Sequence, residues 1–139
     1  MTTDESSLPS EWHAIAAREL AAARLLFNER DEFLAISGML LQQAVEKYLK
    51  GALLARGWML VRIHDLGQLL KALVAYEPAY AEFADACLRI TDFYLENRYP
   101  LRPSSPVNRD ELAKLFEQAE SLIQRIRATG SDRPPPAAS

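Results

Sequence analysis

The stretch that decides the fold is residues 31–57, whose middle reads Leu40-Leu41-Gln42-Gln43-Ala44-Val45-Glu46-Lys47-Tyr48-Leu49-Lys50. At about 100° per residue, its side chains divide between two arcs of one helix. The narrow polar arc contains Gln42, Gln43, Glu46, Lys47 and Lys50. The wider apolar arc contains Leu34, Gly38, Leu41, Val45, Leu49 and Ala52. An apolar arc of this width predicts a central helix that is packed on two or three sides.

The polar arc has two interpretations. It is mixed in sign, and Glu46 and Lys50 stand in the favourable i,i+4 order. It is either a solvated stripe on a core helix or a surface for recognition or dimer formation. The spacing alone does not choose between them.

Composition predicts one soluble globular domain. The chain has 139 residues, of which 49% are hydrophobic and 25% charged. Its 5 glycines and few alternating apolar and polar runs argue against a sheet. A net charge of −3 disfavours a broad basic surface for duplex DNA but permits a local basic pocket.

Three features of the sequence predict a cytoplasmic location. The single Cys87 cannot form an intrachain disulfide, which fits a reducing compartment. No apolar run approaches the roughly 18 residues of a membrane span. The first residues lack the basic and apolar regions of a signal peptide.

Four further helices are predicted around the central one. A first helix over about 11–29 is capped by Ser10, and Asp31 caps the central helix, which Gly57 ends. The later helices run from His64-Asp65 to about Tyr76, from Pro78 to about Arg98, and from Asn108 to Gly130. The apolar face of the first helix is formed by Trp12, Ile15, Ala16, Ala23, Leu26 and Phe27. The expected fold is an all-α, up-and-down bundle of four long helices and one short helix over 10–129, with disordered tails at 1–9 and 130–139.

Arg98 is the first candidate for a binding residue. It extends the stripe Cys87, Thr91, Tyr94 by one step and precedes a loop stiffened by Pro100 and Pro103. Its guanidinium presents a planar fork of donors suited to phosphate. The alternative is an arginine that caps the carboxyl end of its helix.

The other chemical candidates have ordinary structural explanations. His64 precedes Asp65 at a predicted helix start, so it is either a core-edge residue or a group for acid–base chemistry or phosphate contact. His13 and His64 are the two histidines of the chain. Neither lies in a cluster of acidic residues, so no metal site is expected. Cys87 on an apolar helix face indicates core rather than nucleophile. No glycine-rich phosphate loop and no cofactor motif is present.

Three local patterns together resemble the HEPN domain family. They are residues 42–50, then His64-Asp65-Leu66, then Asn97-Arg98-Tyr99-Pro100 before a last amphipathic helix. The resemblance covers about Glu11 to Arg127. It implies a helical bundle, usually a homodimer, commonly encoded beside a minimal nucleotidyltransferase and often in a toxin–antitoxin pair. It also implies nucleotide or RNA binding.

The chain departs from the ribonucleases of that family at one point. Those enzymes carry a histidine four to six residues after the arginine that Arg98 matches, and Tyr99 to Pro106 contain none. The first hypothesis is therefore a binding and assembly protein without intrinsic ribonuclease activity. The alternatives are a metal-independent ribonuclease toxin in which His64 supplies the imidazole, and a helical adaptor without a ligand.

Two expectations about surfaces follow. An anion pocket is expected from Arg98, Tyr99 and a polar-arc residue, with Lys47 the first choice, Gln43 a further candidate and Arg102 a third positive group. A homodimer is expected from the apolar excess on the central helix and the helix that ends at Arg98.

Overall fold

The computed structural model describes residues 6–57, 65–98 and 108–128, and in these ranges all regular structure is helical. The α-helices are α1 (Pro9–Phe27), α2 (Leu34–Ala55), α3 (Leu66–Tyr76), α4 (Ala84–Arg98) and α5 (Arg109–Ala128). Short 3-10 turns over Asp31–Phe33 and Pro78–Phe83 lead into α2 and α4. The predicted all-α bundle of four long helices and one short helix is confirmed. No helix in the described ranges is long and apolar enough to cross a membrane.

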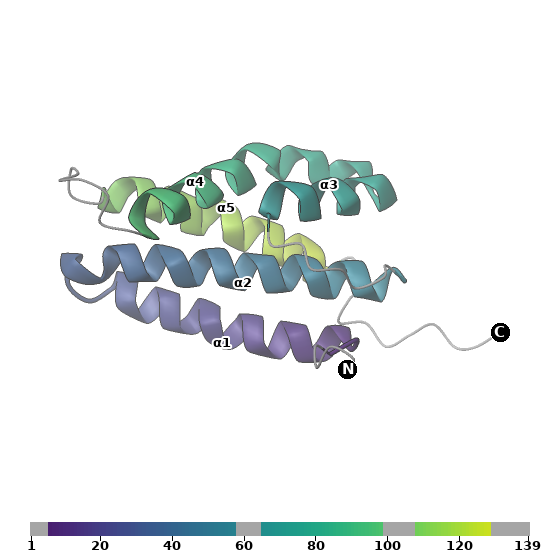
Figure 1. Cartoon of the computed structure of the whole chain (residues 1–139), viewed down its shortest axis with the longest axis horizontal. Helices are drawn as coiled ribbons and strands as arrows, with labels where there is room; N and C mark the ends of the chain where they lie inside the picture. Colours follow the sequence, from purple (N-terminus) through teal and green to yellow (C-terminus); the bar gives the residue numbers. More distant parts are fainter. Residues whose placement is uncertain (1–5, 58–64, 99–107, 129–139) are drawn as a thin grey trace.

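Helix α2 is the centre of the bundle. It contacts each of the other four α-helices, with α1 along one side and α3, α4 and α5 on the other (Figure 1). Thirteen of its residues are buried, which is why its apolar arc is so wide. The prediction of a central helix packed on several sides is confirmed.

Local capping chemistry sets three of the helix ends. The Asp65 side chain accepts a hydrogen bond from Gln68 N at 3.2 Å, and Asn108 Oδ1 accepts from Asp110 N at 2.8 Å and Glu111 N at 3.1 Å. Gly57 has φ of 85°, the left-handed conformation that ends α2. These ends agree with the sequence prediction.

The start of α1 differs from the prediction. The helix begins at Pro9 rather than near 11, and Leu8 rather than Ser10 is its N-cap residue. Proline fits this position because its missing N–H would have no partner within the helix. Residues 6–8 precede the helix, and the Ser6 carbonyl accepts a hydrogen bond from Trp12 Nε1 at 2.7 Å.

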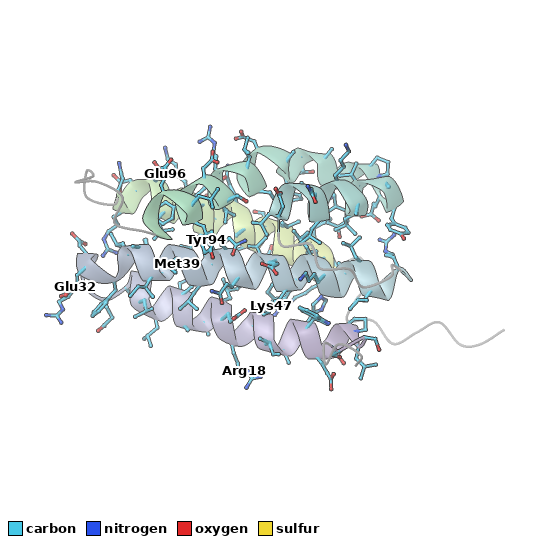
Figure 2. The ribbon with its side chains drawn as sticks, viewed as in Figure 1. Arg18, Glu32, Met39, Lys47, Tyr94 and Glu96 are labelled. Atoms are coloured by element: carbon cyan, nitrogen blue, oxygen red, sulfur yellow. The ribbon has the colours of Figure 1, made fainter. Side chains whose placement is uncertain are left out.

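The polar arc of α2 is not a solvated stripe, because α1 covers much of it. Lys47 lies between the two helices (Figure 2), with Nζ 2.9 Å from Glu19 Oε1 and 3.0 Å from Oε2. Lys50 is only 1% exposed; its Nζ lies 3.2 Å from Glu46 Oε2 and 5.3 Å from the centre of the Trp12 ring. The arc therefore stabilises the α1–α2 contact.

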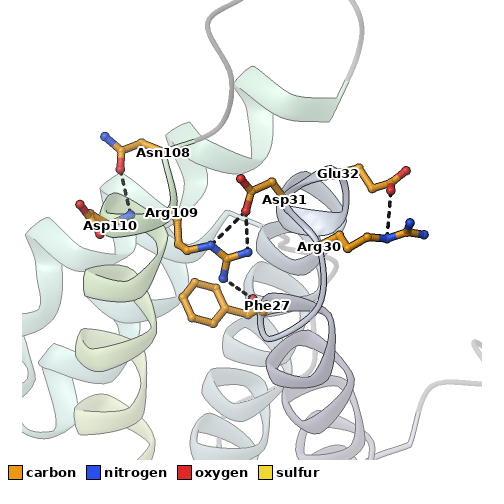
Figure 3. Close-up of polar contacts among 7 residues, drawn as sticks. All are labelled: Phe27, Arg30, Asp31, Glu32, Asn108, Arg109 and Asp110. Atoms are coloured by element: carbon orange, nitrogen blue, oxygen red, sulfur yellow. Dashed lines mark hydrogen bonds and ion pairs between the residues drawn. The ribbon is translucent and has the colours of Figure 1, made fainter.

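The turn between α1 and α2 is connected to the start of α5 by Arg109 (Figure 3). Arg109 Nη2 and Nε lie 2.8 and 3.1 Å from Asp31 Oδ1, and Nη1 donates to the carbonyl of Phe27. Asp31 was predicted to cap the central helix, but no side-chain cap is present there. Its carboxylate instead pairs with a residue 78 positions later in the chain.

Candidate anion-binding site

The candidate site is built where α4 crosses α2. A Cβ atom on Gly38 would overlap the ring of Phe93, so only glycine permits this close approach. The next residues along each helix, Met39 and Tyr94, lie near one another on the visible face of the bundle (Figure 2). The crossing therefore brings the carboxyl half of α4 against the amino half of α2.

The polar groups near this crossing are partly buried. Thr91 Oγ1, one turn before Tyr94, is buried and has no hydrogen-bond partner within the described residues. Gln43 lies one turn after Met39 on α2 and is half-buried. Asp92 and Glu96 are exposed on α4, so the surroundings of the crossing are not uniformly basic.

Arg98 is the last residue of α4, one turn beyond Tyr94. Its side chain is not among the described ones. The Arg98 backbone thus stands at the edge of the α2–α4 crossing, where α4 leads into the segment 99–107. His64, Tyr99 and Arg102 lie outside the described residues, and their proposed roles remain predictions.

Lys47 does not belong to this crossing within one chain. It follows Gly38 by nine residues, about two and a half helical turns, so it lies on the opposite side of α2 and roughly 14 Å along it. The ion pair with Glu19 places Lys47 on the α1 side, whereas Phe93 of α4 packs on Gly38. The expected pairing of Lys47 with Arg98 remains a prediction, because the side chain of Arg98 is not described. Gln43 is the polar-arc candidate closer to the crossing.

A concave feature lies along α1 and was not recognised in the sequence. It is an open groove of about 500 Å³, lined by Ser6, Glu11, Trp12, Ala14, Ile15, Arg18 and Lys47. Ile15 was assigned to the apolar face of the first helix, but it is 40% exposed and forms part of this groove. The sequence signal that could have revealed this groove was the seven-residue spacing of apolar residues on the outer side of α1.

Cys87 belongs to the hydrophobic core, as its position in the sequence indicated. It is fully buried on α4, and this burial raises the pKa of its thiol to about 12 from an ordinary 9.0. A thiol protonated at neutral pH is a poor nucleophile. Among the described residues, no group of three His, Cys, Asp or Glu side chains is placed to hold a metal ion.

Cys87 is expected to react with a thiol reagent only when the chain unfolds. A rise in pKa from 9.0 to about 12 lowers the thiolate fraction of the folded protein about 10³-fold at pH 8. The protonated thiol stabilises the fold below its ordinary pKa, and this contribution is lost as the pH rises toward 12. Labelling rates in buffer and in denaturant, measured by absorbance at pH 8, check this. Equal rates would show that Cys87 is accessible in the folded chain.

The comparisons with known proteins agree with the resemblance drawn from the motifs. The family model of the HEPN domain matches residues 9–129. No curated protein and no solved structure matches the chain. The match spans all five α-helices and includes the α2–α4 crossing and Arg98.

Proposed function

From the premise that the chain belongs to the HEPN domain family, we propose that it binds a nucleotide or an RNA end beside the carboxyl end of α4. It does so as a homodimer that assembles with a minimal nucleotidyltransferase in a toxin–antitoxin-like system. Its role is binding and assembly rather than catalysis.

The position of Arg98 carries the binding part of this proposal. Arg98 ends α4 beside the crossing with α2, where glycine at position 38 lets the two helices meet closely. A guanidinium offers five N–H donors in a fixed fork that matches a phosphate. Thr91 and Tyr94 on α4, and Gln43 on α2, are partly buried and would provide further polar groups. Tyr99 and Arg102 follow within four residues and would add a stacking ring and a second charge.

The absence of a histidine after Arg98 supports a non-catalytic role. Residues 99–106 read Tyr-Pro-Leu-Arg-Pro-Ser-Ser-Pro, and none of these side chains is a general base at neutral pH. RNA cleavage needs a proton acceptor beside the attacking 2′-hydroxyl. A ribonuclease function would therefore need an imidazole from elsewhere in the sequence, and His64 is the candidate.

Arg98→Ala is expected to weaken nucleotide or RNA binding by about 1.5–3 kcal/mol, the range for hydrogen bonds to charged groups. Calorimetric titration of the wild type and the variant with ATP and with a short single-stranded RNA measures this change. Arg89→Ala is a matched control, because Arg89 is an exposed arginine on the same helix and pairs with Asp85 at 2.9 Å.

The outcomes separate binding from stability. Equal affinities of wild type and Arg98→Ala would contradict the site, and a large fall in Tm without loss of binding would assign Arg98 a structural role. Cleavage of the RNA by purified wild type, lost in Arg98→Ala, would favour the ribonuclease and direct attention to His64. Co-expression with the neighbouring nucleotidyltransferase, if one is encoded, tests the assembly part by co-purification.

A further inference from the structure

The groove along α1 has the size and the walls of a site for a small molecule. Its volume of about 500 Å³ falls within the range of roughly 300–1,000 Å³ that is typical of ligand pockets. Trp12, Ala14 and Ile15 give it an apolar lining on α1, and Lys47 of α2 stands on another wall. A compact apolar group therefore has a depression to enter beside Ile15.

Bonds within the chain hold two of these walls in place. Trp12 Nε1 donates a hydrogen bond to the Ser6 carbonyl at 2.7 Å, and Lys50 Nζ lies 5.3 Å from the centre of the same ring. Lys47 Nζ lies 2.9 Å from Glu19 Oε1, so its position is fixed and its charge is neutralised. Because these walls are ordered before a ligand arrives, binding there has a smaller entropic cost.

Arg18 is the polar group of the groove that is left for a ligand. Within the described parts of the chain, its guanidinium makes no hydrogen bond and no ion pair. Its side chain extends from α1 into solvent at the edge of the groove (Figure 2). By contrast, the carboxylate of Glu11 already accepts a hydrogen bond from the Ser6 hydroxyl. An unpaired guanidinium at the rim of an apolar groove is complementary to an anion with an apolar body.

The opposite end of the groove limits the charge of such an anion. Glu11 also lines the groove, and it precedes Arg18 by seven residues, which is about two turns and roughly 10 Å along one face of α1. Its carboxylate would repel a second negative charge on a ligand that fills the groove. A carboxylate with one negative charge therefore fits this groove better than the several phosphate charges of a nucleotide.

We propose that the α1 groove binds a small carboxylate with an aromatic or branched apolar body. The carboxylate pairs with Arg18, and the body lies against Trp12 and Ile15. This inference goes beyond the proposed function, because the groove lies on the α1 side of α2 and does not include the α2–α4 crossing.

Two probes with the same ring and opposite charges test the charge of the occupant. 1-Naphthoate and 1-naphthylmethylammonium are titrated into the full chain labelled with ¹⁵N, and the amide signals are followed by NMR. Naphthoate is expected to shift the signals of residues 11–18 and to bind at least about tenfold more tightly than the ammonium probe.

Two variants test the place of binding. Arg18→Gln is expected to weaken naphthoate binding about tenfold, and Arg89→Gln is its matched control, because Arg89 is an exposed arginine on α4. Ala14→Phe fills the groove from an exposed position and is expected to abolish binding. Ala21→Phe is the control for that change, because it adds the same ring at an exposed position of α1 that does not line the groove. Melting curves check that each variant folds.

The outcomes decide the proposal without reference to the nucleotide site. Binding on α1 that both Arg18→Gln and Ala14→Phe weaken, with both controls unchanged, would support the groove as a carboxylate site. No shifts on α1 at millimolar probe, equal affinities for the two probes, or binding that survives both variants would overturn it. The titrations of Arg98→Ala with ATP and RNA are separate measurements, so the failure of one proposal is distinguishable from the failure of the other.

Discussion

Phe116→Ala is expected to lower the free energy of unfolding by about 3–5 kcal/mol, the largest effect of any single substitution considered for this chain. Phe116 on α5 is 1% exposed, and its ring centre lies 5.2 Å from that of Phe27 on α1. The Arg24 guanidinium lies 4.8 Å from the same ring centre and also pairs with Glu120 of α5. Removing the ring leaves a cavity between the first and last helices and removes the stacking surface of Arg24.

The measurement for Phe116→Ala is urea unfolding followed by circular dichroism. Wild type and variant are compared at one protein concentration, since a dimer makes apparent stability depend on concentration. Leu88→Ala serves as the control, because Leu88 is 58% exposed and its truncation is expected to change stability by about 0.5 kcal/mol or less. A loss below about 1 kcal/mol for Phe116→Ala would show that α1 and α5 do not share one packed core.

Gly38→Val is expected to lower the free energy of unfolding by about 3 kcal/mol or more, because it forces three carbons into a filled contact. A single Cβ at this position would already overlap Phe93 Cε1 and Cδ1, and it would lie 3.1 Å from Cζ. Phe93 is itself buried, so its ring has little space to move away. The substitution should therefore separate α4 from α2 and, with them, the two sides of the candidate site.

Coupling between the two residues distinguishes this clash from a general helix effect. Phe93→Ala in the Gly38→Val background should cost less than the sum of the single changes, because valine occupies part of the space that the ring leaves. Ala55→Val, at the exposed end of the same helix, controls for the lower helix propensity of valine. Additive losses in the double variant would mean that the ring is not what excludes a side chain at position 38.

These two sites show where sequence reasoning succeeded and where it stopped. The apolar positions of the last helix, including Phe116, repeat at helical spacing and are buried, as expected of the amphipathic helix predicted there. The contact of the Phe116 ring with Phe27 was not predicted, because Phe27 lies 89 positions earlier and helical periodicity contains no information about distant neighbours. Gly38 was placed correctly on the apolar arc, but which helix approaches it depends on how the bundle closes.

The candidate site was likewise predictable from the sequence only in part. Arg98 ends its helix as predicted, because the geometry before Pro100 is a local property of the chain. The choice of Lys47 as its neighbour rested on the polar character of one helix face, and the sequence does not show what such a face meets. Glu19 of α1 neutralises Lys47 on the opposite side of α2, so the arc that resembled a solvent or ligand surface became an internal contact.

The number of helices, several of their ends and the family were determined by the sequence itself. Caps such as Asp65 and Asn108, and the left-handed Gly57, act within a few residues, so their effect can be read from neighbouring letters. Only the tertiary structure decided what each face meets: Asp31 binds Arg109 rather than a helix end, and Ile15 lies in a groove rather than in the core. The reason is that pairing between helices depends on the distances between side chains far apart in the chain, which helical periodicity alone does not specify.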